Sequence, residues 1–525
     1  MFLFFDTENS GLSRNFSQIL EIALISTDAD LNMMSRLHLS CKRLPWDVPS
    51  PGALLITGIM PEQLKKEPLT HYQMMRQLAD YIHDQHWPVI FAGYNIHGYD
   101  HGIVSQNLHQ TLHDPFLLTG RKNWRSDANT IFDVLELVRA THIYAPSALK
   151  LKTKSASGKY PSMSLGHVCR QNGIQLDEDE AHGAAADTRA TIDLARKIKN
   201  DVPHIWDQMV KMSNRNNVQS FLEDNEVFAY SQCPYGQAHN VIATRLTDVK
   251  DSKTDAVIWD LNVDPLDYLD KTEAELIEIM KLWGEERFKT PLQPLQKHKQ
   301  PILMPLENAD PVWPAGLDQK IIKSRLKTLK EHPEFAQKVA KAAKKARPDF
   351  VTGIEPEEKI YKFPDNKIRN AIHEWRHDFH QADWDGKQKL IEDFKTRFAK
   401  DIKKDPALER FLQFAKRIIY ADAPETLTEA RKSQYDKAMH QRRTVEDETV
   451  PYMTLPKARA ELANIEEQRA EGNPQWSHVT DGQIRALKLF YTALEREFAG
   501  DQTPPANNNT DSGPDTKSRS GPKSR

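Results

Sequence analysis

The sequence contains few cysteines, and they are not arranged in pairs. Cys41, Cys169 and Cys233 are the only three among 525 residues, and they form no CxxC pairing. Three isolated thiols cannot form a disulfide framework, and their spacing does not fit a structural zinc site. We therefore expect free thiols in a reducing compartment, which predicts a cytoplasmic protein.

Long hydrophobic runs are also missing. The apolar run at the N-terminus ends at Asp6 without a basic segment before it. No other stretch approaches the roughly 20 apolar residues of a membrane span. The chain is 39% apolar and 28% charged, which is typical of soluble globular proteins. The sequence therefore predicts neither a signal peptide nor a membrane segment.

A strong net charge is absent as well, since the formal net charge is −3. Proteins that bind nucleic acids without sequence preference are often basic overall, so bulk charge does not favour that function. It does not exclude it either, because an acidic metal site can offset a basic groove. A chain of 525 residues is too long for one ordinary core, which predicts about two to four domains.

Strand-like runs alternate with helical patterns through residues 1–200. The predicted strands are Phe2–Asp6, Ile19–Ser26 and Val89–Tyr94, and the predicted helices are Pro61–His83, Ile131–Thr141 and Ala184–Ile198. This alternation is typical of an α/β domain built on one mixed sheet.

The remainder of the chain divides into three parts by composition. Residues 201–350 contain strand candidates followed by a Lys/Arg-rich stretch, which predicts a small β domain with basic helices. Residues 351–499 are helical in composition. Residues 500–525 are rich in Pro, Asn, Ser and Gly, and we expect a disordered tail because they contain too few apolar side chains to form a core.

Acidic side chains follow the first predicted strand. Asp6 and Glu8 are two positions apart, so on a strand both carboxylates point to the same face and can bind one metal ion. Phosphodiester hydrolysis needs a nucleophile from water, a Lewis acid on the phosphate and help for the leaving oxygen, and two divalent cations can supply all three. Mg²⁺ and Mn²⁺ prefer carboxylate ligands.

Two further patterns place acids and a histidine at the start of helices. Asn95 and Asp100 follow the strand Val89–Tyr94, and Asp100 is also a residue that favours helix N-termini. His182 and Asp187 can converge only if His182 precedes the helix, because five helical positions rotate a side chain by about 140°. A neutral imidazole is suited to taking a proton from water.

These patterns, in this order, resemble the DEDDh class of 3′→5′ exonucleases. The segment Asp6–Leu12 (DTENSGL) is similar to the class signature DxETxGL, and HGAAAD at 182–187 is similar to its HxxxxD motif. The segment Pro51–Ile59 (PGALLITGI) resembles the one that lines the 3′-terminal nucleotide pocket. With the length and domain pattern of the chain, these features resemble bacterial exodeoxyribonuclease I.

The resemblance implies a fold, an activity and cofactors. It implies a ribonuclease H-like nuclease domain, an SH3-like β domain and a helical C-terminal domain. Two Mg²⁺ ions, with Mn²⁺ as a substitute, are implied. Asp6, Glu8 and Asp187 would hold the first, and Asp6 with Asp100 the second. His182 would be the general base. The implied reaction removes 5′-mononucleotides from the 3′ end of single-stranded DNA, in DNA repair or recombination.

The resemblance also implies substrate contacts and partners. The substrate-binding residues that it implies are Leu55, Thr57, Gly58, Ile59 and Asn95, with Leu55 and Ile59 stacking on a base. Apart from the resemblance, Lys416 and Arg417 are candidates for strand contact, because the nearby Tyr420 could offer a stacking platform. The implied partners are single-stranded DNA and the C-terminal tail of single-strand DNA-binding protein. We expect a monomer.

Two alternative functions stay open at this point. The first is a DEDDh exoribonuclease, because the 2′-hydroxyl contact that separates RNA from DNA is a matter of geometry. The large C-terminal half argues against it, since such enzymes need little beyond the nuclease domain. The second is an inactive single-strand binder. It would be expected to have lost a catalytic acid or the histidine, and all five residues are present.

Overall fold

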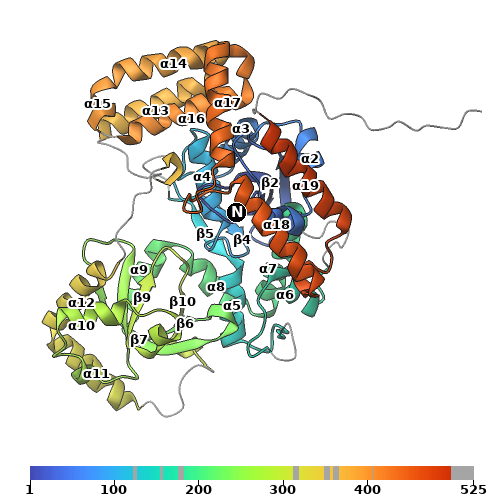
Figure 1. The fold of residues 1–525 in the computed structure, drawn as a ribbon. Coiled ribbons are helices and arrows are strands. Elements are labelled where there is room, and N and C mark those ends of the chain that lie inside the picture. Colours follow the sequence, from blue (N-terminus) through green and yellow to red (C-terminus); the bar gives the residue numbers. More distant parts are fainter. Residues whose placement is uncertain are drawn as a thin grey trace, which may run out of the picture.

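The computed structural model contains two five-stranded sheets surrounded by helices (Figure 1). It describes residues 1–121, 127–153, 158–175, 183–310, 318–347, 355–358, 366–404 and 406–497. Within these ranges no helix is both long enough and apolar enough to cross a bilayer.

The first sheet has the strand order β3-β2-β1-β4-β5. Its strands are β1 Phe2–Asn9, β2 Ile19–Thr27, β3 Met33–Ser40, β4 Ile90–Gly93 and β5 Thr130–Asp133. β2 runs antiparallel to β1 and β3, whereas β4 runs parallel to β1 and β5. This confirms the mixed sheet and the α/β class. β3 was not expected from the sequence, because most of its side chains are exposed and it lacks an apolar run.

Helices cover both faces of this sheet because β1 is apolar on both sides. Leu3 and Phe5 share a core with α3 His71–His83 and α4 Asp100–Gln110. Phe2 and Phe4 point to the opposite face. The helices on that face are α5 Val134–Tyr144, α6 Leu165–Gln171, α7 Ala184–Asp201 and α8 Pro203–Met212.

The structure differs from the sequence-based predictions at two places. The predicted helix Ile131–Thr141 begins only at Val134, because Thr130–Asp133 forms the short edge strand β5 and Asp133 caps the helix by accepting from the Leu135 N–H. The segment PGALLITGI, to which no regular element was assigned from the sequence, forms helix α1 Pro51–Thr57, capped by Ser50 and ended by Gly58 at φ 73°. Helix α2, Pro61–Lys66, follows.

The second sheet is antiparallel, with the order β10-β6-β7-β8-β9. Its strands are β6 Phe228–Gln232, β7 His239–Asp248, β8 Asp255–Asp260, β9 Leu292–Gln296 and β10 Ile302–Pro305. The helices beside it are α9 Arg215–Asp224, α10 Glu273–Met280, α11 Gln319–Glu331 and α12 Pro333–Lys345. We call residues 215–345 the β domain.

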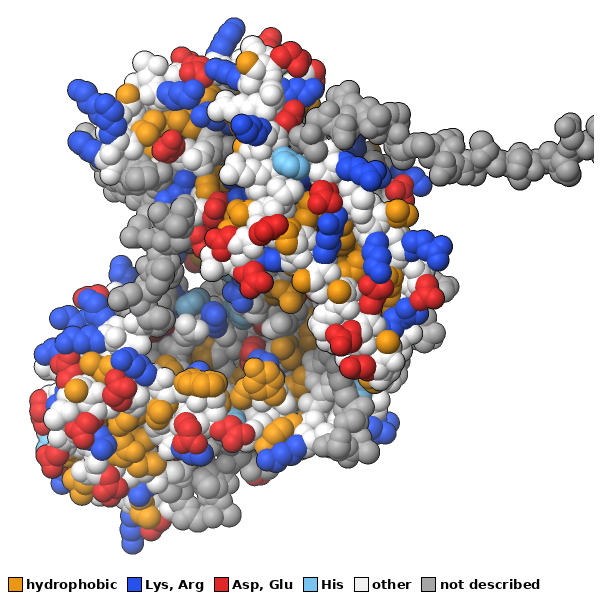
Figure 2. Space-filling model, in the orientation of Figure 1, with side chains coloured by type: hydrophobic (Ala, Val, Ile, Leu, Met, Phe, Trp, Pro, Cys, Tyr) orange, Lys and Arg blue, Asp and Glu red, His pale blue; other side chains and the backbone are white. Residues whose placement is uncertain are grey.

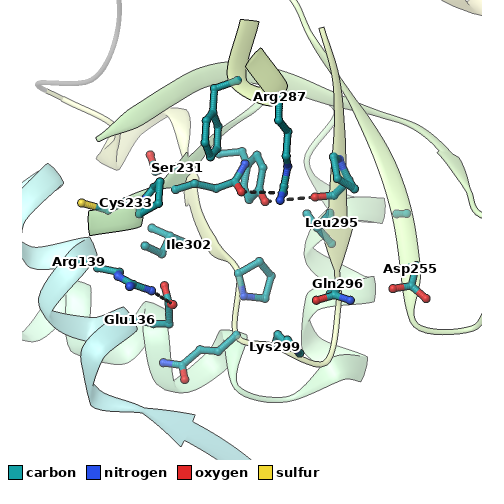
Figure 3. A pocket seen from close by; sticks show the side chains of 18 of the residues that line it. Glu136, Arg139, Ser231, Cys233, Asp255, Arg287, Leu295, Gln296, Lys299 and Ile302 are labelled. Carbon is teal, nitrogen blue, oxygen red and sulfur yellow. Dashed lines mark hydrogen bonds and ion pairs between the residues drawn. The ribbon is translucent and has the colours of Figure 1, made fainter. Parts of the chain in front are cut away.

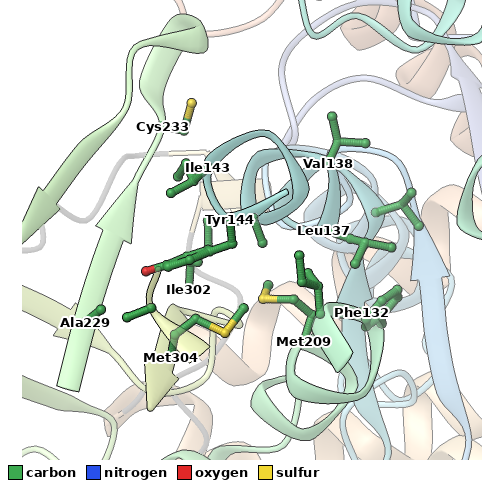
Figure 4. Packing of buried hydrophobic residues seen from close by; sticks show 14 of the residues in the cluster. Phe132, Leu137, Val138, Ile143, Tyr144, Met209, Ala229, Cys233, Ile302 and Met304 are labelled. Atoms are coloured by element: carbon green, nitrogen blue, oxygen red, sulfur yellow. The ribbon is translucent and has the colours of Figure 1, made fainter. Parts of the chain in front are cut away.

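The two sheets are joined by one continuous apolar core. Figure 4 shows Ile143 and Tyr144 of α5 packed beside Ile302 and Met304 of β10. The Tyr144 hydroxyl also hydrogen-bonds to Ser231 Oγ of β6 at 2.8 Å, and both groups are buried. The β domain is therefore packed firmly against the first sheet.

The C-terminal helices divide between two cores. Helices α13 Asn366–Gln381, α14 Trp384–Arg397, α15 Ala399–Lys404, α16 Pro406–Asp422 and α17 Glu429–Thr444 form a bundle with an aromatic core (Figure 1). Helices α18 Leu455–Ala470 and α19 Asp481–Arg496 pack instead against α1. The described helices of residues 351–499 therefore contribute to two separate apolar cores.

Candidate active site

Three carboxylates converge beside the end of β1. Asp6 and Glu8 lie on the same face of β1, and Asp187 lies in the first turn of α7. One oxygen from each of the three lies within 4.8 Å of the others. The structure therefore brings together the three acids that the sequence predicted for one metal ion.

The fourth predicted acid, Asp100, is the first residue of α4 and is buried. The Thr7 hydroxyl donates to Asp100 Oδ1 at 2.6 Å, so a residue between Asp6 and Glu8 also orients this carboxylate. Asp100 is not part of the three-carboxylate group, but its charge acts on Asp6 and Glu8.

Burial and mutual repulsion hold protons on this site. Burial, followed by the charges of Asp100, Glu8 and Asp187, raises the pKa of Asp6 well above its ordinary value. Burial, followed by the charges of Asp187, Glu21 and Asp100, raises the pKa of Glu8 to about 9. Burial raises the pKa of Asp100 to about 6, against the hydrogen bond from Thr7, which lowers it.

This donor set fits divalent cations. Asp6, Glu8 and Asp100 all resist ionisation in this site, and a bound cation would stabilise their charged forms. All the donors are oxygens, which favours hard ions such as Mg²⁺ and Mn²⁺ over softer metals. The side chains therefore match the cofactor that the sequence implied.

A fifth acid, Glu21, was missed by sequence reasoning. It pairs with Glu8 across β1 and β2, and its Oε1 accepts from the Ala184 N–H at 3.1 Å. The N-cap residue of α7, Gly183, has no side chain to cap the helix, so Glu21 stabilises its first turn from the neighbouring strand. The available signal was an acid within the otherwise apolar segment ILEIALIS.

His182 lies outside the described residues. The start of α7 at Ala184 nevertheless agrees with the predicted order, in which the histidine precedes the helix and Asp187 follows on its first turn. The predicted role of His182 stays a prediction.

The expected substrate-contact residues on and after α1 differ in how far they are exposed. Leu55 is only 2% exposed and packs in the core formed with α18 and α19, so its predicted stacking on a base is wrong for this conformation. Helical periodicity turns the neighbouring Ile56 outward, and this residue, which is 44% exposed, was missed. Thr57 accepts from the Ile59 N–H, and Gly58 faces open space. Ile59 is partly buried against the same core as Leu55.

The predicted contacts on α16 are largely used in internal interactions. Arg417 forms an ion pair with the buried carboxylate of Glu357 at 2.6 Å. Tyr420 is buried and donates to Asp436 at 2.6 Å, so it cannot serve as a stacking platform. Lys416 lies beside α14 and α17, where burial lowers its pKa. An amphipathic helix places residues three and four apart on one face, and here that face is internal.

Two exposed residues remain near the metal-binding acids. Asn95, at φ 60° in the loop before α4, is exposed as expected. Leu12, four positions after Glu8, is 89% exposed and was not predicted. Figure 2 shows that the molecule is deeply hollowed between the β domain and the remaining parts, with histidine and basic side chains visible inside the hollow.

A separate pocket of about 750 Å³ lies between α5 and the strands of the β domain (Figure 3). Its walls carry both signs of charge. Arg139 pairs with Glu136 at 2.5 Å, and Arg287 donates to Gln232 at 2.9 Å. Most of these charges therefore already have partners.

The sequence and the fold were compared with known proteins. Residues 3–195 match the exonuclease family model RNase T. The exodeoxyribonuclease I of Escherichia coli K12 is 24% identical over 362 residues, which cover 66% of this chain and 73% of that protein. The exonuclease I structure from Methylocaldum szegediense has a TM-score of 0.72 at 21% identity. Escherichia coli exonuclease I bound to a dA16 oligonucleotide has a TM-score of 0.73 at 20% identity.

Both structural alignments cover 94% of this chain and 99% of the other. The family match contains Asp6, Glu8, Asp100 and Asp187, so the acids that converge in space belong to the matched region. Residues 3–195 thus match an exonuclease family model, and the chain shares the fold of exonuclease I over most of its length.

Proposed function

We propose that this protein hydrolyses single-stranded DNA from its 3′ end and releases 5′-mononucleotides. The observation that carries the proposal is the cluster of Asp6, Glu8 and Asp187 within an exonuclease-family domain. Similar proteins are named exodeoxyribonuclease I, and similar structures were determined with dA16 and dT13 oligonucleotides. These names support a single-stranded DNA substrate.

The proposal includes two Mg²⁺ ions, for which Mn²⁺ can substitute. Asp6, Glu8 and Asp187 would hold one ion, and Asp6 with Asp100 the other. When bound, such cations lower the pKa of water and stabilise the charge of the phosphate in the transition state. The all-oxygen donor set favours Mg²⁺, although a zinc-bound form of the Escherichia coli enzyme with single-stranded DNA is known.

Other residues of this protein would transfer the proton and contact the substrate. His182 takes the proton from the attacking water. Leu12 and Ile56 offer exposed apolar surface to the terminal bases, and stacking on such a surface does not depend on base identity. Gly58 leaves open space for the sugar, since no atom lies within 4 Å of where its side chain would begin.

On the basis of the resemblance, the proposal also includes a cellular process, a compartment and a protein partner. A nuclease of this type acts in DNA repair or recombination, in the cytoplasm, as a monomer that binds the C-terminal tail of single-strand DNA-binding protein. The search for that docking surface can begin on the hollowed face in Figure 2.

A nuclease assay tests the proposal directly. The purified protein is incubated with end-labelled single-stranded DNA, duplex DNA and RNA of one sequence, with Mg²⁺ or with EDTA. We expect 5′-mononucleotides from the 3′ end of single-stranded DNA only, and no product with EDTA or with Asp187→Ala. Equal or faster cleavage of RNA would contradict the substrate. Binding without any cleavage would make the protein a single-strand binder.

Thr7→Val tests the link between β1 and Asp100. The substitution keeps the shape of the side chain but removes the 2.6 Å hydrogen bond to the carboxylate. We expect the Mg²⁺ concentration that gives half-maximal activity to rise about tenfold, because groups that orient metal ligands contribute strongly to metal affinity. Thr7→Ser keeps the hydroxyl and should titrate like the parent. Identical titration of the valine variant would show that Asp100 is oriented without Thr7.

A further inference from the structure

The loop between β4 and α4 is held by one buried carboxylate. The Asn95 N–H donates to Asp133 Oδ1 at 2.8 Å, and the His97 N–H donates to Asp133 Oδ2 at 3.0 Å. Asp133 is only 2% exposed, so the loop cannot shift without leaving a buried carboxylate short of donors. The position of this loop is therefore fixed by the end of β5.

The same loop leads directly to Asp100. The Gly98 and Tyr99 N–H groups both donate to the Asn95 carbonyl, so the loop is a closed turn that ends at the first residue of α4. Asp100 is thus held from two sides, by Thr7 through its carboxylate and by this turn through its backbone. Asn95 projects from the same turn and is exposed.

Asp133 is itself held by the β domain. Its N–H donates to Gln300 Oε1 at 2.5 Å, across two parts of the chain separated by 167 positions. Gln300 is fully buried and adopts a left-handed backbone conformation with φ 45°. A residue other than glycine keeps such a conformation only where its surroundings determine it.

The turn that carries Gln300 is anchored on its other side. This turn connects β9 to β10, and the buried ammonium of Lys297 donates to Gln219 at 2.6 Å and to Asp248 at 2.8 Å. Figure 3 shows Lys299 of the same turn across the pocket from Glu136 and Arg139 of α5. The turn is therefore anchored within the β domain by contacts other than the one to Asp133.

We propose that Gln300 and Asp133 are positioning residues for the metal site. In this arrangement Gln300 of the β domain fixes the end of β5. Asp133, at that end, fixes the turn between β4 and α4, and this turn fixes Asp100. The inference rests on the proposed function, because it assigns the β domain a part in shaping the same metal site. A nuclease domain without this contact would keep its acids but hold Asp100 less firmly.

The interface offers a matched control. Tyr144 and Ser231 join the same two parts of the molecule by another buried hydrogen bond, and among the described residues neither side chain hydrogen-bonds to Asp133 or to residues 95–99. Among the described residues, Gln300 Nε2 has no hydrogen-bond partner, so Gln300→Met removes one hydrogen bond at similar volume. Tyr144→Phe likewise removes one buried hydrogen bond from this interface.

The test measures metal binding without DNA. Mn²⁺ binding to the full chain is followed by calorimetry for the parent, Gln300→Met, Asp133→Asn and Tyr144→Phe, together with thermal unfolding. We expect Mn²⁺ affinity to fall about threefold in Gln300→Met and about tenfold in Asp133→Asn, as for other groups that orient metal ligands. Tyr144→Phe should unfold at a lower temperature and bind Mn²⁺ like the parent.

The outcomes separate this inference from the proposed function. If Gln300→Met and Tyr144→Phe both lose stability and both keep the parent's Mn²⁺ affinity, the contact is structural only and the inference is wrong. If Asp133→Asn fails to fold, the Mn²⁺ affinity of Gln300→Met alone tests the inference. If the parent neither binds Mn²⁺ nor cleaves single-stranded DNA, the proposed function fails and the inference fails with it.

Discussion

Glu8→Gln is expected to abolish nuclease activity and, at the same time, to stabilise the metal-free protein. The activity should fall by at least about 10³-fold, because the substitution removes a metal ligand from a reaction that depends on metal ions. The stability should rise because Glu8 is buried among Asp6, Asp100 and Asp187 without a cation. A neutral amide of the same shape relieves that repulsion.

The pH dependence follows from the direction of the pKa shift. The pKa of Glu8 is about 9 in the folded protein, compared with an ordinary value of 4.5. Above pH 4.5 the unfolded chain loses this proton while the folded protein keeps it, so the metal-free parent loses stability as the pH rises toward 9. Glu8→Gln lacks this loss. The difference should grow by about 1.4 kcal/mol per pH unit between pH 4.5 and pH 8 and should vanish near pH 4.

Thermal unfolding with EDTA at pH 4 and pH 8 measures this difference. Excess Mg²⁺ should raise the unfolding temperature of the parent and leave Glu8→Gln almost unchanged, because the variant has lost a metal ligand. Glu471→Gln, at an exposed position just after α18, should behave like the parent throughout. If Glu8→Gln unfolds below the parent at pH 8 without metal, the repulsion inferred for this site is absent.

The site residues that could be predicted from the sequence are those that belong to local sequence patterns. Asp6 and Glu8 could be assigned because a strand places alternate residues on one face. Asp187 could be assigned because the helix start after His182 is encoded by small residues. Glu21 carries no such pattern, since its importance arises from the pairing of β1 with β2 and from the distant start of α7.

The failed predictions involve contacts between distant parts of the chain. Leu55 was expected at the substrate, but α18 and α19 cover that face of α1. Arg417 was expected on DNA, but Glu357 binds it. Gln300 was assigned no role from the sequence, because its contact with Asp133 depends on how the two sheets pack. A single sequence indicates which faces of its helices and strands are apolar, but it does not indicate which part of the chain covers each face.

His182→Ala separates proton transfer from metal binding, and it is the second substitution with a large expected effect. The rate of cleavage should fall by about 10²–10⁴-fold, the usual contribution of a positioned general base. The three-carboxylate cluster of Asp6, Glu8 and Asp187 should remain intact, so Mg²⁺ should still stabilise the variant. Asp187→Ala should lose both the activity and the stabilisation by Mg²⁺.

The position of His182 in the chain supports this separation. Glu21 holds the Ala184 N–H, two positions after the histidine, so the start of α7 does not need the imidazole for support. The pH–rate profile gives the sharpest readout. The parent should lose activity at acid pH, because a protonated imidazole can no longer act as a base. In His182→Ala this limb should disappear.

His204→Ala, on the exposed surface of α8, is the matched control and should keep the parent's rate and profile. If His182→Ala loses Mg²⁺ stabilisation as completely as Asp187→Ala, the histidine supports the metal site and is not the base. If it keeps the acidic limb, the proton acceptor is one of the carboxylates. Asp100 is then the first candidate, because burial raises its pKa to about 6.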